Sequence, residues 1–195
     1  MTVGRSPAEA PPPVLETARL RLRPPAPEDA AAIAAIADDL EVARWLTRMP
    51  HPYGIADARF FLSDVVPAEW CWLIAGKDDG RAMGVIGLRP EGDEVGSSSE
   101  PSAVELGYWL GRASWGQGFA TEAGAAVLAW AETALRPAAF VAGRYAENAR
   151  SGRVLAKLGF VETGRSTRES RALGRRLPYV DLRRAPGQPI LRPIV

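Results

Sequence analysis

The residues best suited to bind an anion form a glycine-containing turn in the middle of the chain. Gly116 and Gly118 lie between a strand-like segment at 104–110 and an amphipathic segment that begins at Phe119. The first turn of a helix leaves backbone N–H groups without partners, and glycine lets a backbone approach a ligand closely. The pattern therefore predicts a phosphate or pyrophosphate site, with an ordinary tight turn as the alternative interpretation.

Two better-known phosphate motifs do not match this turn. A Walker P-loop is excluded because no Gly-Lys-Ser/Thr follows the glycines. A dinucleotide-binding Gly-x-Gly-x-x-Gly is excluded because Thr121 occupies the third glycine position.

Charge is balanced over the whole chain but not along it. The 195 residues include 24 basic and 23 acidic side chains, a formal net charge of +1. Residues 1–140 carry 12 basic and 19 acidic side chains, net −7, whereas residues 141–195 carry 12 and 4, net +8. The C-terminal part is thus a candidate surface for a phosphorylated cofactor, with a solvated basic face as the alternative. Nucleic-acid binding is disfavoured, because no aromatic-interleaved basic stripe accompanies these residues.

Composition narrows the class of protein. Apolar residues make up 47% and charged residues 24%, as in ordinary globular domains. The single cysteine, Cys71, excludes a disulfide framework, and the single histidine, His51, argues against a His-pair metal site or a Ser-His-Asp triad. No apolar run reaches the roughly 20 residues of a membrane helix, and residues 1–14 lack the apolar core of a secretory signal. We expect a cytoplasmic protein without a bound metal or a membrane anchor.

Hydrophobic patterning predicts one mixed α/β (α+β) domain over residues 15–184 without internal repeats. A disordered or extended Pro/Ala-rich arm at 1–14 precedes it, and a tail at 185–195 follows. Residues 90–102 form a polar, mobile loop, and Pro178 indicates an edge strand. The predicted strands cover 15–24, 70–75, 83–88, 104–110, 138–142, 160–163 and 177–182, and the predicted helices cover 27–37, 40–46, 56–66, the segment from the glycine turn to about 134, and 148–158.

Three blocks around the glycine turn form a recognisable pattern. Trp115-Gly116-Gln117-Gly118-Phe119-Ala120 resembles an R/Q-x-x-G-x-G/A motif, preceded by Glu105-Leu106-Gly107-Tyr108-Trp109-Leu110 and followed by Thr121-Glu122-Ala123. Residues 148–160 are similar to N-x-x-S-x-x-V-L-x-K-L-G-F, and residues 15–23 look like a matching first strand. Together these blocks resemble the GCN5-related N-acetyltransferases (GNAT), and within them the ribosomal-protein N-terminal acetyltransferases and their relatives. The first motif position, usually Arg or Gln, holds Trp115; because the motif binds phosphate largely through its backbone, we expect cofactor binding to survive.

The resemblance implies a fold and a place for a cofactor. The fold is a mostly antiparallel, twisted sheet with flanking helices, whose fourth and fifth strands splay apart to admit acetyl-CoA. The backbone of Tyr108, Trp109 and Leu110 would pair with the pantetheine amides, and an N–H near Trp109 or Leu110 would polarise the thioester carbonyl. Asn148 would contact the pantetheine arm, and Ser151 would lie near the sulfur. The pyrophosphate would be held by backbone N–H groups of Trp115, Gly116, Gln117, Gly118, Phe119, Ala120 and Thr121.

The implied reaction is direct attack of an amine on the thioester in a ternary complex. Glu105 is the candidate general base, acting directly or through water; alternatively it is a solvent-facing strand residue or pairs with an arginine. Ser151 is the candidate for protonating the departing thiolate; alternatively it only belongs to the first turn of a helix capped by Asn148. Glu122 fits an acid at a helix start better than a catalyst.

The acceptor is not readable from the residues. Five aromatic residues lie where such enzymes build an acceptor groove, although core packing explains most of them: Trp45, Tyr53, Phe60, Trp70 and Trp72. The leading hypothesis is an acetyl-CoA-dependent N-acetyltransferase, monomeric or homodimeric, that acts on a protein N-terminus or a small-molecule amine. The alternatives are a non-catalytic acyl-CoA-binding sensor and a basic module that binds RNA or ribosomes through residues 141–195.

Overall fold

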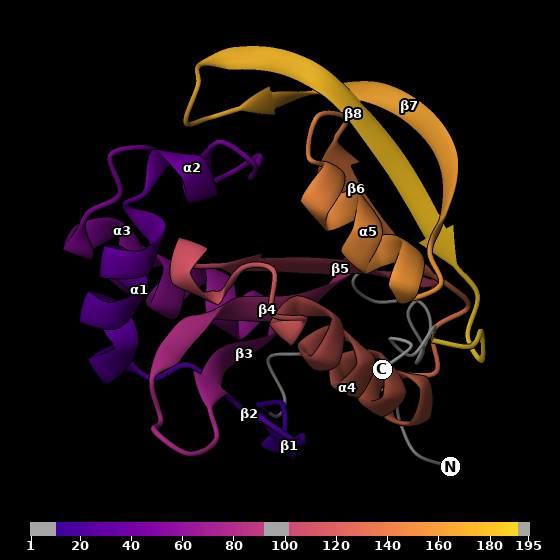
Figure 1. Cartoon of the computed structure of the whole chain (residues 1–195), viewed down its shortest axis with the longest axis horizontal. Helices are drawn as coiled ribbons and strands as arrows, with labels where there is room; N and C mark the ends of the chain where they lie inside the picture. The colour runs from indigo at the N-terminus through magenta and orange to yellow at the C-terminus, as the bar shows by residue number, and fades with distance from the viewer. Residues whose placement is uncertain (1–10, 92–101, 191–195) are drawn as a thin grey trace.

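The computed structural model describes residues 11–91 and 102–190, and within them eight strands form one sheet. Their order is β1-β2-β3-β4-β5-β6-β8-β7, and neighbours are antiparallel except for β5 and β6. The predicted mixed, mostly antiparallel architecture is confirmed (Figure 1). The strands are β1 (Leu15–Glu16), β2 (Leu20–Arg23), β3 (Trp70–Gly76), β4 (Ala82–Glu91), β5 (Ala103–Leu110), β6 (Phe140–Tyr145), β7 (Val161–Ser170) and β8 (Arg175–Arg184).

Helices cover both faces of the sheet. Side chains of α4 and α5 join one buried cluster, and side chains of α1 and α3 join a second. Figure 1 shows α1, α2 and α3 gathered at one end, with α4 and α5 apart from them. The α-helices of the described residues are α1 (Ala30–Ala37), α2 (Leu40–Ala43), α3 (Ile55–Phe60), α4 (Phe119–Ala134) and α5 (Ala149–Lys157).

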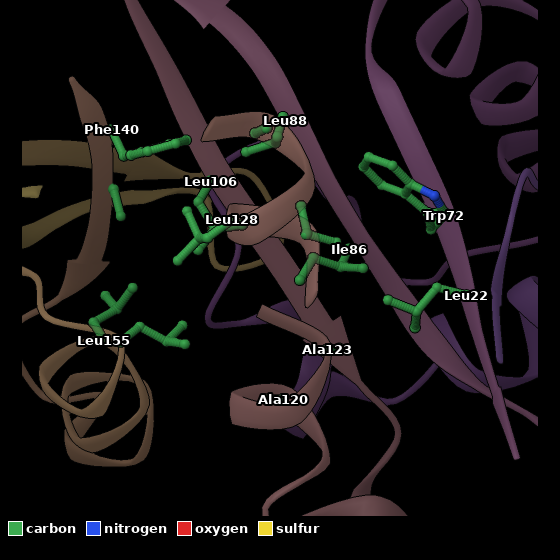
Figure 2. Close-up of a cluster of buried hydrophobic side chains, with 14 of the residues drawn as sticks. Leu22, Trp72, Ile86, Leu88, Leu106, Ala120, Ala123, Leu128, Phe140 and Leu155 are labelled. Atoms are coloured by element: carbon green, nitrogen blue, oxygen red, sulfur yellow. The ribbon is translucent and has the colours of Figure 1, made fainter. Parts of the chain in front are cut away.

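The central strand β3 shows why the sheet is covered on both sides. Its seven residues, WCWLIAG, are all buried, as expected for a strand without a solvent face. Alternate side chains point to opposite faces, so Trp72 joins the cluster under α4 while Cys71 joins the cluster under α1 and α3. In Figure 2, Trp72 lies in the first cluster, which also contains Ile86 and Leu128.

The feature that matters for function is the separation of β5 from β6. Strand β5 pairs with β4 along its whole length, from Gly84↔Leu110 to Glu91↔Ala103. Its parallel pairing with β6 stops after two positions, Val104↔Phe140 and Glu105↔Val141. These are the fourth and fifth strands of the sequence prediction, so the predicted splay is confirmed.

Several predicted boundaries differ from the structure. The strand expected over 15–24 is broken at Thr17, whose backbone N–H donates to the carbonyl of Leu20 and whose hydroxyl oxygen accepts from Leu20 N–H, so β1 and β2 form a tight hairpin. The helix expected over 56–66 ends as α3 at Phe60 and continues as a π-helical turn, Phe61–Val65. The expected loop at 90–102 begins later, because β4 extends to Glu91; residues 92–101 lie outside the described residues.

The prediction from Pro178 is wrong, because β8 lies between β6 and β7 and is not an edge strand. Pro178 pairs with Thr167 on the β7 side and lies just past the last paired residue of β6, Tyr145. There the carbonyl of Ala146 accepts from Arg144 Nη1 at 2.7 Å. A side chain thus supplies the hydrogen bond that proline cannot donate.

The segments flanking the predicted domain contact it. The indole Nε1 of Trp72 donates to the carbonyl of Pro13 at 2.7 Å, so the end of the predicted arm lies against the sheet. On the C-terminal side, buried Arg184 donates to the carbonyl of Gln188 and pairs with Glu132 at 2.6 Å. Residues 1–10 and 191–195 of the predicted arm and tail lie outside the described residues.

Candidate active site

The loop between β5 and α4 has the backbone geometry of an anion site. Gly116 and Gly118 adopt φ values of 76° and 81°, which favour glycine. Gly118 is the N-cap of α4 and has no side chain that could accept hydrogen bonds from the first backbone amides of the helix. A Cβ on Gly116 would meet nothing within 4 Å, and one on Gly118 would meet only Arg19 Nη2, at 3.5 Å. Open space therefore lies over unpaired amides, the combination that binds phosphate.

Side chains outside the loop hold it in place. Arg19 Nη1 donates to the carbonyl of Gln117 at 3.0 Å, and its guanidinium pairs with Glu122 at 2.6 Å. Glu122 also accepts from the Thr17 hydroxyl at 2.6 Å. Burial acts to raise the pKa of Glu122, but these hydrogen bonds outweigh it and the pKa lies below its ordinary value. Glu122 is therefore committed to fastening α4 to the β1–β2 turn.

Trp115 takes a structural role at the motif position that usually holds Arg or Gln. Its indole Nε1 donates to the carbonyl of Leu110 at 2.7 Å, which ties the loop to the end of β5. The guanidinium of Arg150, on α5, lies 4.9 Å from the centre of the indole ring, within range of a cation–π contact. Trp115 therefore fixes the loop through its contacts with Leu110 and Arg150, in place of the usual Arg or Gln side chain.

The sheet register shows which backbone groups of β5 face the gap. Gly111 N donates to Met83 at 2.9 Å on the β4 side, whereas Val104 N donates to Ala139 at 3.1 Å on the β6 side. Because these directions alternate along a strand, Tyr108 N–H and C=O and Leu110 N–H point into the gap. Trp109 instead belongs to the ladder with β4, and the Leu110 carbonyl is already occupied by Trp115.

Tyr108 and Ser151 meet across the gap. The Tyr108 hydroxyl lies 2.9 Å from Ser151 Oγ. Burial raises the pKa of Tyr108 above its ordinary value, and the hydrogen bond to Ser151 offsets only part of that increase. Ser151 belongs to the first turn of α5, and its N–H donates to Asn148 Oδ1 at 3.1 Å. Asn148 is therefore the N-cap, as the sequence indicated, and Ser151 lies on the wall of the gap.

On the other face of the sheet, charged residues form a row across β5, β4 and the residue that precedes β3. Glu105 on β5 and Arg89 on β4 are register partners and form an ion pair. The next position in the row is Glu69, just before β3, which pairs with Arg48 at 3.0 Å. Glu105 is 31% exposed, so its carboxylate borders the cleft while paired with Arg89. The structure thus brings Glu105 to the site and also realises the arginine pairing considered from the sequence.

Tyr179 on β8 is a site residue that the sequence reasoning missed. Its ring and hydroxyl lie against the backbone of Gly143 on β6, where a Cβ would overlap them. Burial, together with the negative charges of Glu105 and Asp181, raises the pKa of Tyr179 to about 12. A glycine inside a strand can mark such a close approach, so Gly143 was the available signal.

These features line one continuous cleft of about 1040 Å³. One half, called the cofactor half because the sequence predicts a cofactor there, includes the glycine loop, the exposed side of β5 and the basic residues Arg150, Arg153 and Lys157 of α5, so part of the C-terminal positive charge lies here. The other half, called the acceptor half after the groove that the resemblance implies, is lined by residues of α2, α3, their connecting loop, the charged row and the β7–β8 hairpin. Within residues 11–91 and 102–190, no helix is long and apolar enough to cross a membrane.

Solved structures of similar fold include acetyltransferases. A GNAT-family acetyltransferase from Bacillus anthracis matches with a TM-score of 0.77 and 18% identity over 90% of this chain and 100% of that one. The ribosomal-protein-S5-alanine acetyltransferase of Vibrio fischeri matches with 0.74 and 19%, over 91% and 100%. Mycobacterium smegmatis RimJ, solved in complex with CoA-disulfide, matches with 0.70 and 22%, over 88% of each chain.

The sequence itself carries the family assignment. No curated protein matches it significantly. The family model described as the acetyltransferase (GNAT) domain matches residues 19–161, which include β2 to β6, the glycine loop and α5. The chain therefore belongs to the GNAT acetyltransferase family.

Proposed function

We propose that the protein is an acetyl-CoA-dependent N-acetyltransferase that transfers the acetyl group to a primary amine in a ternary complex. The observation that carries the proposal is the gap between β5 and β6, which runs from their last paired residues to the unpaired amides at the start of α4. A long ligand with an anionic end and an amide-rich arm fits this shape. GNAT enzymes use acetyl-CoA, which has that form.

The cofactor's orientation follows from the positions of these groups. The diphosphate would lie on the backbone of residues 115–121, near the cationic side chains of Arg150 and Arg153. The pantetheine arm would run along β5 and pair with the free backbone groups of Tyr108, while Asn148 and Ser151 line its other side. The thioester would then lie toward Glu105, where the two strands meet. Leu110 N–H, which also points into the gap, lies at the glycine-loop end of β5 and would pair with the arm, because Glu105 is five residues further along the strand. Of the two free amides, Tyr108 N–H is the one nearer the thioester and the better placed to polarise its carbonyl, which is an oxyanion-hole role.

The chemistry forms one bond and breaks another. The amine nitrogen attacks the thioester carbon, the C–N bond forms, and the C–S bond breaks to release a thiolate. Glu105 accepts the amine proton, directly or through water. The thiolate takes a proton from a hydroxyl on the wall of the gap, either Ser151 or Tyr179. A phenol is more acidic than an aliphatic hydroxyl, so Tyr179 is the better donor of the two.

One observation supports a second function, a non-catalytic acyl-CoA sensor. The ion pair with Arg89 engages the carboxylate of Glu105, the candidate base. A sensor would keep the loop and the gap but would not need Glu105 to accept a proton. The two functions share cofactor binding and differ only in turnover.

Isothermal titration with acetyl-CoA, followed by a thiol-release assay with a panel of primary amines, tests both. We expect micromolar binding and amine-dependent release of CoA. Glu105→Gln should lower kcat by about 10²–10⁴-fold and move its pH dependence upward, with cofactor affinity nearly unchanged. Binding without turnover would favour the sensor, an unaltered pH–rate profile would remove Glu105 from the mechanism, and no binding would reject both functions.

A further inference from the structure

We propose that the acceptor is a small primary amine with one cationic group and an apolar body, selected by the acceptor half of the cleft. The inference rests on the proposed acetyl transfer and adds the substrate class. Three independent features support it: an exposed aromatic wall, acids that are already partnered, and a hydrogen bond that joins two parts of the cleft wall.

The aromatic wall comes from the end of α3. Phe60 is 60% exposed, the highest value among the exposed large hydrophobic residues of the described chain, and it lines the cleft. Phe61 and Val65, in the π-helical turn that follows, line the cleft as well. Such turns are rare and are frequent at functional sites. Because an exposed apolar side chain in a cleft gains by contact with an apolar ligand, this wall favours an apolar body.

The acids of this half are largely engaged by the protein itself. Glu69 pairs with Arg48, and Glu105 pairs with Arg89. Asp57 accepts from Gly54 N at 2.9 Å and caps α3. Glu169, on the exposed hairpin, is the fourth acid that lines this part of the cleft. A polyamine or an aminoglycoside needs several uncommitted carboxylates, whereas a single ammonium group needs one.

A hydrogen bond that joins the β7–β8 hairpin to the segment after α2 narrows the acceptor half. Arg171 N, at the tip of the β7–β8 hairpin, donates to the carbonyl of Thr47, after α2, at 3.2 Å. Both residues line the cleft, so the hydrogen bond joins its opposite walls. Figure 1 shows the hairpin arching from the sheet toward α2. This contact ties the hairpin to the segment after α2 and so favours a small amine over a lysine held on a folded protein surface.

The test compares amines on the full-length protein saturated with acetyl-CoA. The probes are 2-phenylethylamine, ethylamine, spermidine and a hexapeptide with a free N-terminal serine. Each reaction forms an amide and releases CoA, which a thiol reagent detects. Burial of the phenyl group predicts a kcat/KM for 2-phenylethylamine about 10- to 100-fold above that for ethylamine. Spermidine and the peptide should react more slowly than 2-phenylethylamine.

Two variants of one helix locate the effect. Phe60→Ala should bring the ratio of kcat/KM for 2-phenylethylamine over ethylamine down toward one. Ile55→Ala is the matched control, because Ile55 lies on α3 and is 44% exposed but does not line the cleft; it should leave the ratio unchanged.

The outcomes separate this inference from the proposed function. A preference for spermidine or the peptide, or an unchanged ratio in Phe60→Ala, overturns the substrate class while acetyl transfer stands. Turnover of none of the four amines by a protein that binds acetyl-CoA also overturns the class. Failure to bind acetyl-CoA instead rejects the proposed function itself, before any acceptor is tested.

Discussion

Replacing Gly118 by tryptophan should abolish cofactor binding and leave the fold intact. Gly118 is the N-cap of α4 with φ 81°, and the nearest atom to an added Cβ is Arg19 Nη2 at 3.5 Å, an ordinary contact. The protein therefore has room for a side chain here. The variant should lose about 1–2 kcal/mol of stability, mainly because a non-glycine residue must adopt the left-handed conformation. The indole would then occupy the open space over the first amides of the helix.

The loss of affinity can be estimated from the contacts removed. A hydrogen bond from a backbone amide to a charged phosphate contributes about 1.5–3 kcal/mol. If the indole displaces the diphosphate from two amides, binding weakens by about 3–6 kcal/mol, which corresponds to roughly 10²–10⁴-fold in Kd.

The assay is titration calorimetry with CoA on variants whose folding is verified by thermal denaturation. Gly80→Trp is the matched control: Gly80 has φ 66° in the β3–β4 turn, and a Cβ there would meet nothing within 4 Å. It carries a similar backbone strain outside the cleft and should bind CoA like the unaltered protein. A folded Gly118→Trp with undiminished affinity, or an equal loss in Gly80→Trp, would refute the placement of the diphosphate.

The two remaining predictions concern a proton donor and a structural carboxylate. Tyr179→Phe should lower kcat by about 10²-fold or more with CoA affinity unchanged, and by more than Ser151→Ala does; the reverse order in steady-state kinetics would assign the donor role to Ser151. Glu122→Gln should destabilise the protein most near neutral pH. Because the folded pKa of Glu122 lies below its ordinary value of 4.5, the stabilisation is present above that value and disappears as the pH falls through the folded pKa. Urea denaturation of both proteins should show the difference shrinking below about pH 4.5; a constant difference would contradict the assignment.

Features set by local sequence were predictable. The cap at Asn148 and the glycine turn before α4 depend on backbone geometry that a few neighbouring residues determine. The gap between β5 and β6 was predicted from the family resemblance. The structure agrees, because β5 pairs with β6 only at Val104 and Glu105. These features concern the backbone, so a change of side chain such as Trp115 does not obscure them.

Features that depend on strand register were not predictable. Arg89 meets Glu105 because β4 and β5 pair in one register across residues 92–101, which no local pattern determines. Tyr179 reaches the cleft because β8 inserts between β6 and β7, whereas Pro178 had indicated an edge. In both cases tertiary pairing, rather than local propensity, decides which side chains meet.

This division explains why the family can be assigned while the acceptor must be argued from geometry. In the proposed complex the cofactor half of the cleft would bind through amides of the glycine loop and β5, and such contacts tolerate many side chains. The acceptor half is lined by side chains from separate elements, such as Phe60 from α3 and the Arg89–Glu105 pair from the sheet. Any one of these can change without disturbing the fold, since each lies at the cleft surface. Selectivity for the amine should therefore respond to single substitutions in that half, whereas affinity for the cofactor should not.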